Sequence, residues 1–173
     1  MAKGGALWGI VVITPTAPQM AAPLQQHAPI FSGESRHSLD EKMRVTIPSR
    51  WRGKEDGGDE FFLTVDRSGA FVRAMPPEVF YGLPQKLAKN AGISEAEIAK
   101  FERLFYARSK PVTTDKQGRI ILPAEYCASA GIKKEVVLVG TRASFEIYSP
   151  IAWDRAQQSE AAAFDRLAEL AGL

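Results

Sequence analysis

The sequence of 173 residues has few of the side chains that hold metals or form disulfides. It contains one cysteine, Cys127, and two histidines, His27 and His37. A single cysteine excludes an intramolecular disulfide framework and fits a reducing cytosol. With so few thiolate and imidazole ligands, we expect neither a structural zinc site nor any other metal or cofactor.

Long apolar runs and a large net charge are also absent. No stretch approaches the roughly 18 consecutive apolar residues of a membrane-spanning helix, so we expect no membrane partner. The formal net charge is only +2, so binding to nucleic acid would need a local cluster of arginine and lysine. The hydrophobic content of 45% and charged content of 24% are typical of a globular protein.

The first 29 residues differ in composition from the rest of the chain. Lys3 precedes an apolar run over residues 6–13, and a tract with four prolines follows over residues 14–29. This order is weakly similar to a secretory signal peptide. The tract holds little that could pack, so we expect residues 1–29 to be a disordered N-terminal extension and the folded part to begin near Ile30.

One short unit occurs twice in the remaining chain. Residues 40–48, DEKMRVTIP, and residues 115–123, DKQGRIILP, each combine a polar turn, a basic residue, an apolar run and a proline. The elements predicted after each proline come in the same order: a short helix, two strands around a turn, and a helix that starts at a proline. A repeat this consistent indicates one supersecondary unit used twice.

The duplication predicts an α+β fold with a pseudo-two-fold β unit. The expected segments are an extension (1–29), a first β repeat (30–76), a helical hairpin (77–108), a second β repeat (109–150) and a C-terminal helix (151–173). Ser94 and Glu97 predict a capping box at the start of the second hairpin helix. One repeat buries too little apolar surface to be stable by itself. Residue spacing leaves open whether the two repeats interleave.

The chemistry of the repeated turn is compatible with DNA recognition. Asp115 can accept hydrogen bonds from the backbone of its own turn, and Gly118 suits a positive φ. Asp115 can also pair with Arg119 and hold its guanidinium in one orientation. An oriented arginine at the tip of a β-ribbon suits the major groove, where arginine pairs bidentately with guanine. The simpler interpretation is an ordinary turn with a surface ion pair worth at most about 1 kcal/mol.

Two equivalent turns with basic neighbours favour the DNA-binding interpretation. These neighbours are Arg36, Lys42, Arg50, Arg52, Arg108, Lys110 and Lys116. The pattern D-x-x-x-R, then an apolar run and proline, duplicated around a helical hairpin, resembles the MraZ family of bacterial proteins. The resemblance covers about residues 30–154. It is strongest over residues 115–123 and the following Gly131, 134–140 and 145–147.

The resemblance implies a tandem AbrB-like fold, in which two repeats form a swapped-hairpin β-barrel. It also implies a homo-oligomeric ring, an octamer or a dodecamer, in the cytoplasm and associated with the nucleoid. The implied activity is transcription regulation by binding double-stranded DNA at short direct repeats. In the family these repeats lie in the promoter of the division and cell-wall cluster that includes the regulator's own gene.

Carried over by position, the resemblance also implies site residues. The DNA-binding residues would be Arg44 above all, with Lys42, Arg119 and Lys116, and the turn-organising residues Asp40, Asp115 and Gly118. Met43 departs from the family pattern, which has glycine there, and a positive φ at Met43 would cost on the order of 1 kcal/mol. Because the first copy lies in the denser arginine cluster, we expect residues 40–44 to be the main DNA-reading tip. Residues 115–119 would mainly be its structural counterpart.

Two other classes of function stay open. An antitoxin-like module would bind a protein partner through the N-terminal tail or an exposed part of the C-terminal helix, without direct DNA readout. An enzyme would need a catalytic set, and Ser35, His37 and Asp40 are the nearest candidates. Strand alternation predicts that Ser35 and His37 share a face but lie too far apart for a direct relay. Gly57 and Gly58 lie in an acidic loop that would repel phosphate. We therefore expect no enzyme, no catalytic residue and no small-molecule substrate.

Three groups of apolar side chains also have expected roles. Cys127 is expected to pack in the interior as a small apolar residue. The run of Phe101, Phe105 and Tyr106 follows helical spacing, which predicts a place in the core or at a subunit interface. The weakly amphipathic middle of the C-terminal helix either packs through small residues or projects from the body.

Overall fold

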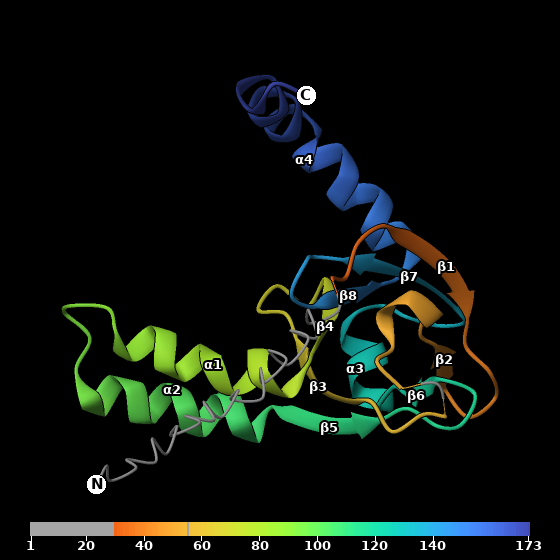
Figure 1. The fold of residues 1–173 in the computed structure, drawn as a ribbon, viewed down its shortest axis with the longest axis horizontal. Helices are drawn as coiled ribbons and strands as arrows, with labels where there is room; N and C mark the ends of the chain where they lie inside the picture. Colours follow the sequence, from red (N-terminus) through yellow and green to blue (C-terminus); the bar gives the residue numbers. More distant parts are fainter. Residues whose placement is uncertain (1–29, 55) are drawn as a thin grey trace, which may run out of the picture.

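A computed structural model describes residues 30–54 and 56–173. The predicted disordered extension therefore lies outside the described residues. The strands are β1 (Glu34–Ser38), β2 (Arg44–Thr46), β3 (Glu60–Val65), β4 (Phe71–Met75), β5 (Ser109–Thr113), β6 (Arg119–Ile121), β7 (Glu135–Gly140) and β8 (Phe145–Tyr148). The helices are the 3-10 turn η1 (Ser49–Trp51), α1 (Pro77–Ala88), α2 (Glu95–Ala107), α3 (Ala124–Ser129) and α4 (Pro150–Ala171). The predicted α+β class is confirmed (Figure 1).

The strands of the two repeats pair with each other. One antiparallel sheet has the order β1-β7-β8-β4-β3-β5, and β2 pairs with β6 in a separate two-stranded ribbon. Each repeat contributes its own hairpin, β3–β4 or β7–β8, while β1 pairs with β7 and β5 pairs with β3. The repeats therefore interleave, which the residue spacing had left open.

The strand order reads the same from both ends when equivalent strands are exchanged. The pseudo-two-fold axis passes between β4 and β8 and through the ribbon, where Val45 lies opposite Ile120. The same register sets Arg44 opposite Ile121 and Thr46 opposite Arg119. The turns precede β2 and β6 at opposite ends of this short ribbon, and ion pairs between their side chains show that they lie on one side of the molecule.

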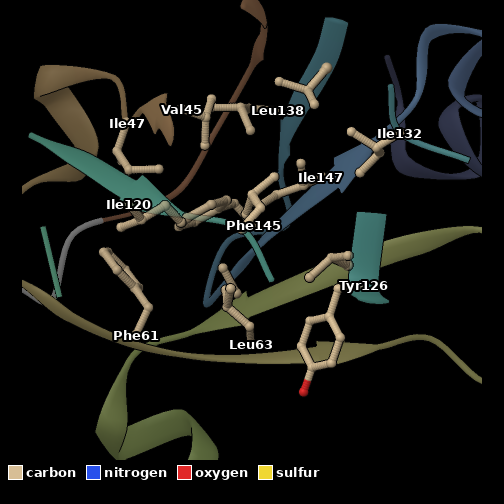
Figure 2. Close-up of a cluster of buried hydrophobic side chains, with 14 of the residues drawn as sticks. Val45, Ile47, Phe61, Leu63, Ile120, Tyr126, Ile132, Leu138, Phe145 and Ile147 are labelled. Atoms are coloured by element: carbon tan, nitrogen blue, oxygen red, sulfur yellow. The ribbon is translucent and has the colours of Figure 1, made fainter. Parts of the chain in front are cut away.

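The core lies between the ribbon and the large sheet (Figure 2). Val45 and Ile120 are 0% exposed and belong to the same buried cluster as Phe145 and Leu138 from the sheet. This follows from strand alternation, since the neighbours of Val45 and Ile120 on each strand face solvent or the turns. The Trp51 ring packs against Phe145 with 5.3 Å between the ring centroids, which attaches the short segment after β2 to the sheet.

Helices α1 and α2 form the predicted hairpin, which extends from one side of the sheet (Figure 1). The capping box is present: Ser94 Oγ accepts from the Glu97 N–H, and the Glu97 carboxylate accepts from the Ser94 N–H. Phe80 is 1% exposed and stacks on Phe62 at 4.0 Å and on Phe105 at 4.8 Å. The hairpin is thus attached to β3 through one aromatic stack.

Helix α4 projects from the body, one of the two predicted alternatives (Figure 1). Its first turn is fastened by Ser149, whose Oγ accepts from the Ala152 N–H, and by Trp153, which lies 5.2 Å from the Tyr148 ring. Beyond this turn the apolar side chains are exposed, with Phe164 at 66% and Leu170 at 76%. The helix therefore offers an unpartnered apolar surface in the single chain.

The Cys127 thiol is buried as predicted, since its residue is 3% exposed within the core cluster. Burial raises the pKa of this thiol, with a smaller contribution from the Glu125 carboxylate. A raised pKa keeps the sulfur protonated and less nucleophilic. The residue therefore acts as a small apolar side chain.

Candidate nucleic-acid interface

The first repeated turn is held by the carboxylate of Asp40. Its Oδ1 accepts from the backbone N–H groups of Lys42 and Arg44, both at 2.9 Å. Its Oδ2 accepts from Arg44 Nε at 2.7 Å. The turn also closes through its backbone, because the Met43 N–H donates to the Asp40 carbonyl at 2.9 Å. One aspartate thus fixes both the turn and the direction of the arginine.

The second turn repeats this geometry. Asp115 Oδ1 accepts from the N–H groups of Gln117 and Arg119 at 3.0 and 2.9 Å, and its Oδ2 accepts from Arg119 Nε at 2.9 Å. The Gly118 N–H donates to the Asp115 carbonyl at 2.8 Å. Arg119 Nη2 also donates to Gln117 Oε1 at 2.8 Å. Two sequences that share only Asp and Arg at equivalent positions therefore adopt the same turn.

The two turns are joined by reciprocal ion pairs. Arg44 Nη1 lies 3.8 Å from Asp115 Oδ2, and Arg119 Nη1 lies 3.7 Å from Asp40 Oδ2. Sequence reasoning predicted the pairs within each turn and missed those between the turns. No local pattern could have predicted them, because these contacts require the pairing of β2 with β6, which residue spacing left open.

Hydrogen bonding favours the ionised form of both aspartates. The pKa of Asp40 is lowered, first by the hydrogen bond from the Arg44 N–H and further by the Arg44 guanidinium. The pKa of Asp115 is lowered chiefly by the hydrogen bond from the Arg119 side chain. That same bond raises the pKa of Arg119. At neutral pH the cluster therefore holds two carboxylates and two guanidinium groups.

The remaining predicted residues surround this cluster. Lys42 and Lys116 are exposed within the two turns, so their ammonium groups are free to contact a polyanion. Gly118 has φ of 72°, as predicted for its place in the turn. Met43 adopts φ of 58° at the equivalent position, so the first turn keeps its shape at the conformational cost expected of a non-glycine residue.

The ion pairs of the two turns are nearly the same. The Arg44 and Arg119 side chains are 26% and 25% exposed, and each guanidinium contacts both aspartates. They differ in one hydrogen bond, which Arg119 Nη2 donates to Gln117 Oε1 and which has no equivalent for Arg44 among the described residues. The predicted dominance of residues 40–44 stays a prediction. Arg44 and Arg119 are brought together as one paired site.

One expectation about catalytic groups is wrong. Ser35 Oγ and His37 Nε2 lie 2.8 Å apart, so they form the direct hydrogen bond that strand alternation had been taken to prevent. Residues i and i+2 of a strand point to the same side, and the imidazole is long enough to span the gap. Asp40 does not complete a triad, since its hydrogen bonds go to Lys42 and Arg44.

Burial lowers the pKa of His37, which favours its neutral form. Within residues 30–54 and 56–173, no group of three or more His, Cys, Asp or Glu side chains is arranged to hold a metal ion. None of the helices described is both long and apolar enough to span a membrane.

Comparison with known proteins gives consistent matches. The family model described as "MraZ protein, putative antitoxin-like" matches residues 105–171. A protein of Desulforamulus reducens named "Transcriptional regulator MraZ" is 35% identical over 140 residues, which cover 81% of this chain and 96% of that protein. Relatives of the same name from Leuconostoc citreum and Heliobacterium modesticaldum are 36% and 33% identical, each over 81% of this chain and 95% of the relative.

The region aligned with these relatives spans nearly their whole length and most of this chain. The family model matches residues 105–171, which include the turn that resembles the family most closely. On this similarity, the chain belongs to the MraZ family.

Proposed function

We propose that the chain is a sequence-specific DNA-binding transcriptional regulator and not an enzyme. Its targets would be direct repeats in the promoter of the division and cell-wall gene cluster that includes its own gene. It would act in the cytoplasm, on the nucleoid. The names of its relatives, "Transcriptional regulator MraZ", support the regulatory role.

The observation that carries the proposal is the paired site formed by the two turns. Two guanidinium groups, Arg44 and Arg119, are oriented by carboxylates on the face of a two-stranded ribbon opposite the buried Val45 and Ile120. A two-stranded ribbon fits the major groove, and an arginine guanidinium can pair with guanine O6 and N7. Exposed Lys42 and Lys116 would add contacts to phosphates from the same face.

The finer architecture proposed for the chain is the AbrB-like swapped-hairpin barrel. Interleaved pairing of β1 with β7 and of β5 with β3 supports it, as does the central ribbon of β2 and β6. The proposed segments are those expected from the sequence, with a β repeat on each side of the α1–α2 hairpin. In this arrangement neither repeat would be complete without the other, which explains why the motif is duplicated within one chain.

A ring of subunits, an octamer or a dodecamer, is the proposed functional state. Exposed apolar side chains of α2 support it, because Phe101, Leu104 and Tyr106 are 38%, 54% and 43% exposed in the single chain. Several subunits on one duplex would engage consecutive repeats and raise the overall affinity without new contacts per subunit. Leu104→Glu should lower the mass measured by light scattering, whereas Ala99→Glu, at an exposed position on another face of the same helix, should leave it unchanged.

A second candidate function is binding of a protein partner without direct DNA readout. Two observations favour it: the exposed apolar side chains of α4, and the antitoxin-like description of the family model that matches this half of the chain. Co-purification of one stoichiometric partner, together with no DNA shift, would support this candidate against the first.

The deciding experiment is an electrophoretic mobility shift with the DNA upstream of the protein's own gene. The full chain should shift this DNA and not an unrelated duplex of equal length, and DNase I footprinting should protect regularly spaced direct repeats. Size analysis of the free protein would establish the oligomer in the same preparation. Equal affinity for both duplexes would contradict sequence-specific regulation.

A further inference from the structure

The paired site has little net charge of its own. Two guanidinium groups face two carboxylates within ion-pair distance, so their charges largely cancel. DNA affinity depends mainly on cations that neutralise phosphates. A cation that lies close to the turns but outside their ion pairs is therefore expected to contribute to DNA affinity by neutralising a phosphate.

Arg52 is such a cation, and it lies against the second turn. A Cβ atom added to Gly118 would be 2.5 Å from Arg52 Nη1 and 2.6 Å from its Cζ. The guanidinium thus occupies the space that glycine leaves open. Arg52 is set there by the preceding residue, Trp51, which is 1% exposed in the core, and by its own N–H, which donates to the Ser49 carbonyl at 3.1 Å.

This contact exists on only one side of the pseudo-two-fold axis. The residue equivalent to Arg52 in the second repeat is Cys127, which is buried and uncharged. The residue equivalent to Gly118 is Met43, whose side chain packs against the core. The first repeat therefore supplies an arginine to the turn of the second repeat, and the second repeat supplies none in return.

The surroundings of Arg52 leave its charge available. Among the described residues no carboxylate lies within ion-pair distance of it. Its Nε is buried without a hydrogen-bond partner, which leaves the two Nη groups to contact a ligand. It borders an open hollow of about 330 Å³ that is also lined by Ser49, Gly53 and Lys54. The nearby Asp59 carboxylate is turned to the Gly53 N–H at 2.9 Å.

We propose that Arg52 binds a backbone phosphate of the DNA that faces the turn of residues 115–119, with Ser49 and Lys54 beside it. The inference rests on the proposed DNA-binding function and adds a positioning contact that neither turn contains. Guanidinium groups bind phosphate oxygens bidentately, and such contacts set the register of the protein on the duplex without reading bases. The two turns would then differ in phosphate anchoring while sharing the same base-reading geometry.

The test compares Arg52→Gln with Arg103→Gln, a control that removes one exposed arginine from α2. Fluorescence anisotropy with the full chain measures affinity for the upstream duplex and for an unrelated duplex at several salt concentrations. Arg52→Gln should weaken both affinities by the same factor, about 3- to 10-fold, and reduce the salt slope by about 1. Arg52→Lys should keep the slope, because it keeps the charge. Arg103→Gln should match the wild type.

Unchanged affinity and slope for Arg52→Gln, with normal DNA binding by the wild type, would overturn the phosphate contact and leave the proposed function intact. A loss confined to the upstream duplex would also overturn it, because that result assigns Arg52 to base readout. If the wild type itself bound neither duplex, the proposed function would fail and this inference with it.

Discussion

Arg44 Nη1 lies 3.8 Å from Asp115 Oδ2, although the two residues belong to different copies of the repeat. The reciprocal pair, Arg119 with Asp40, spans 3.7 Å. Each arginine is thus oriented by the aspartate of its own turn and approached by the aspartate of the other. The two turns form one site, and the effects of changing them should be coupled.

Arg44→Ala and Arg119→Ala should each weaken binding to the upstream duplex. The expected loss is about 1–3 kcal/mol apiece, the range of one bidentate base contact. Similar losses are expected because the two turns have the same geometry. Mobility shifts give the affinities, and light scattering should find the oligomer unchanged. A large loss for Arg44→Ala with none for Arg119→Ala would show that the first turn dominates despite the symmetry.

Stability should depend on pH through Asp40 and Asp115. Both pKa values are lowered in the folded chain from an ordinary value of 3.8. The carboxylates therefore stabilise the fold fully above pH 3.8, and this contribution is lost as pH falls through the lower folded values. Urea denaturation between pH 3 and 7 measures the difference in free energy of unfolding between the wild type and the Asp40→Asn/Asp115→Asn variant. It should shrink toward low pH, and a constant difference would contradict this account.

Gly57→Ala should destabilise the chain more than Gly58→Ala. Both glycines have positive φ, 81° and 87°, so a side chain costs on the order of 1 kcal/mol at either position. A Cβ at position 57 would also lie 2.3 Å from the Asp115 carbonyl oxygen, whereas at position 58 its nearest neighbour is the Lys54 side chain at 3.8 Å. Overpacking against the backbone adds about 1–3 kcal/mol. Denaturant midpoints compare the two variants, and equal midpoints would rule out the backbone contact.

Glu146→Ala should destabilise more than Tyr148→Phe. Glu146 is 9% exposed, accepts from the Tyr148 hydroxyl at 2.8 Å and pairs with Arg73 at 2.8 Å. Removing the carboxylate leaves the tyrosine hydroxyl unpaired near the base of α4, at a cost of about 1–3 kcal/mol. Tyr148→Phe keeps the ion pair and should cost about 1 kcal/mol. The midpoint temperatures of thermal unfolding rank the variants. The reverse order would show that the Tyr148 hydroxyl contributes more to stability than the Glu146 carboxylate.

The sequence by itself determined the local elements and the repeat. Alternation, prolines and turn residues identified the strands, the capping box of Ser94 and Glu97, and the pairing of each aspartate with the arginine four residues later. These features depend on contacts within a few residues, so their physical causes are present in the sequence. The same patterns carried the resemblance to the MraZ family.

Only the tertiary structure decided how the two copies act together. Antiparallel pairing of β2 with β6 sets each arginine, Arg44 and Arg119, within ion-pair distance of the aspartate of the other turn. It also places Arg52 of the first repeat over Gly118 of the second. Contacts between residues distant in the chain depend on strand register and on the space a neighbour leaves open, and no local pattern encodes either.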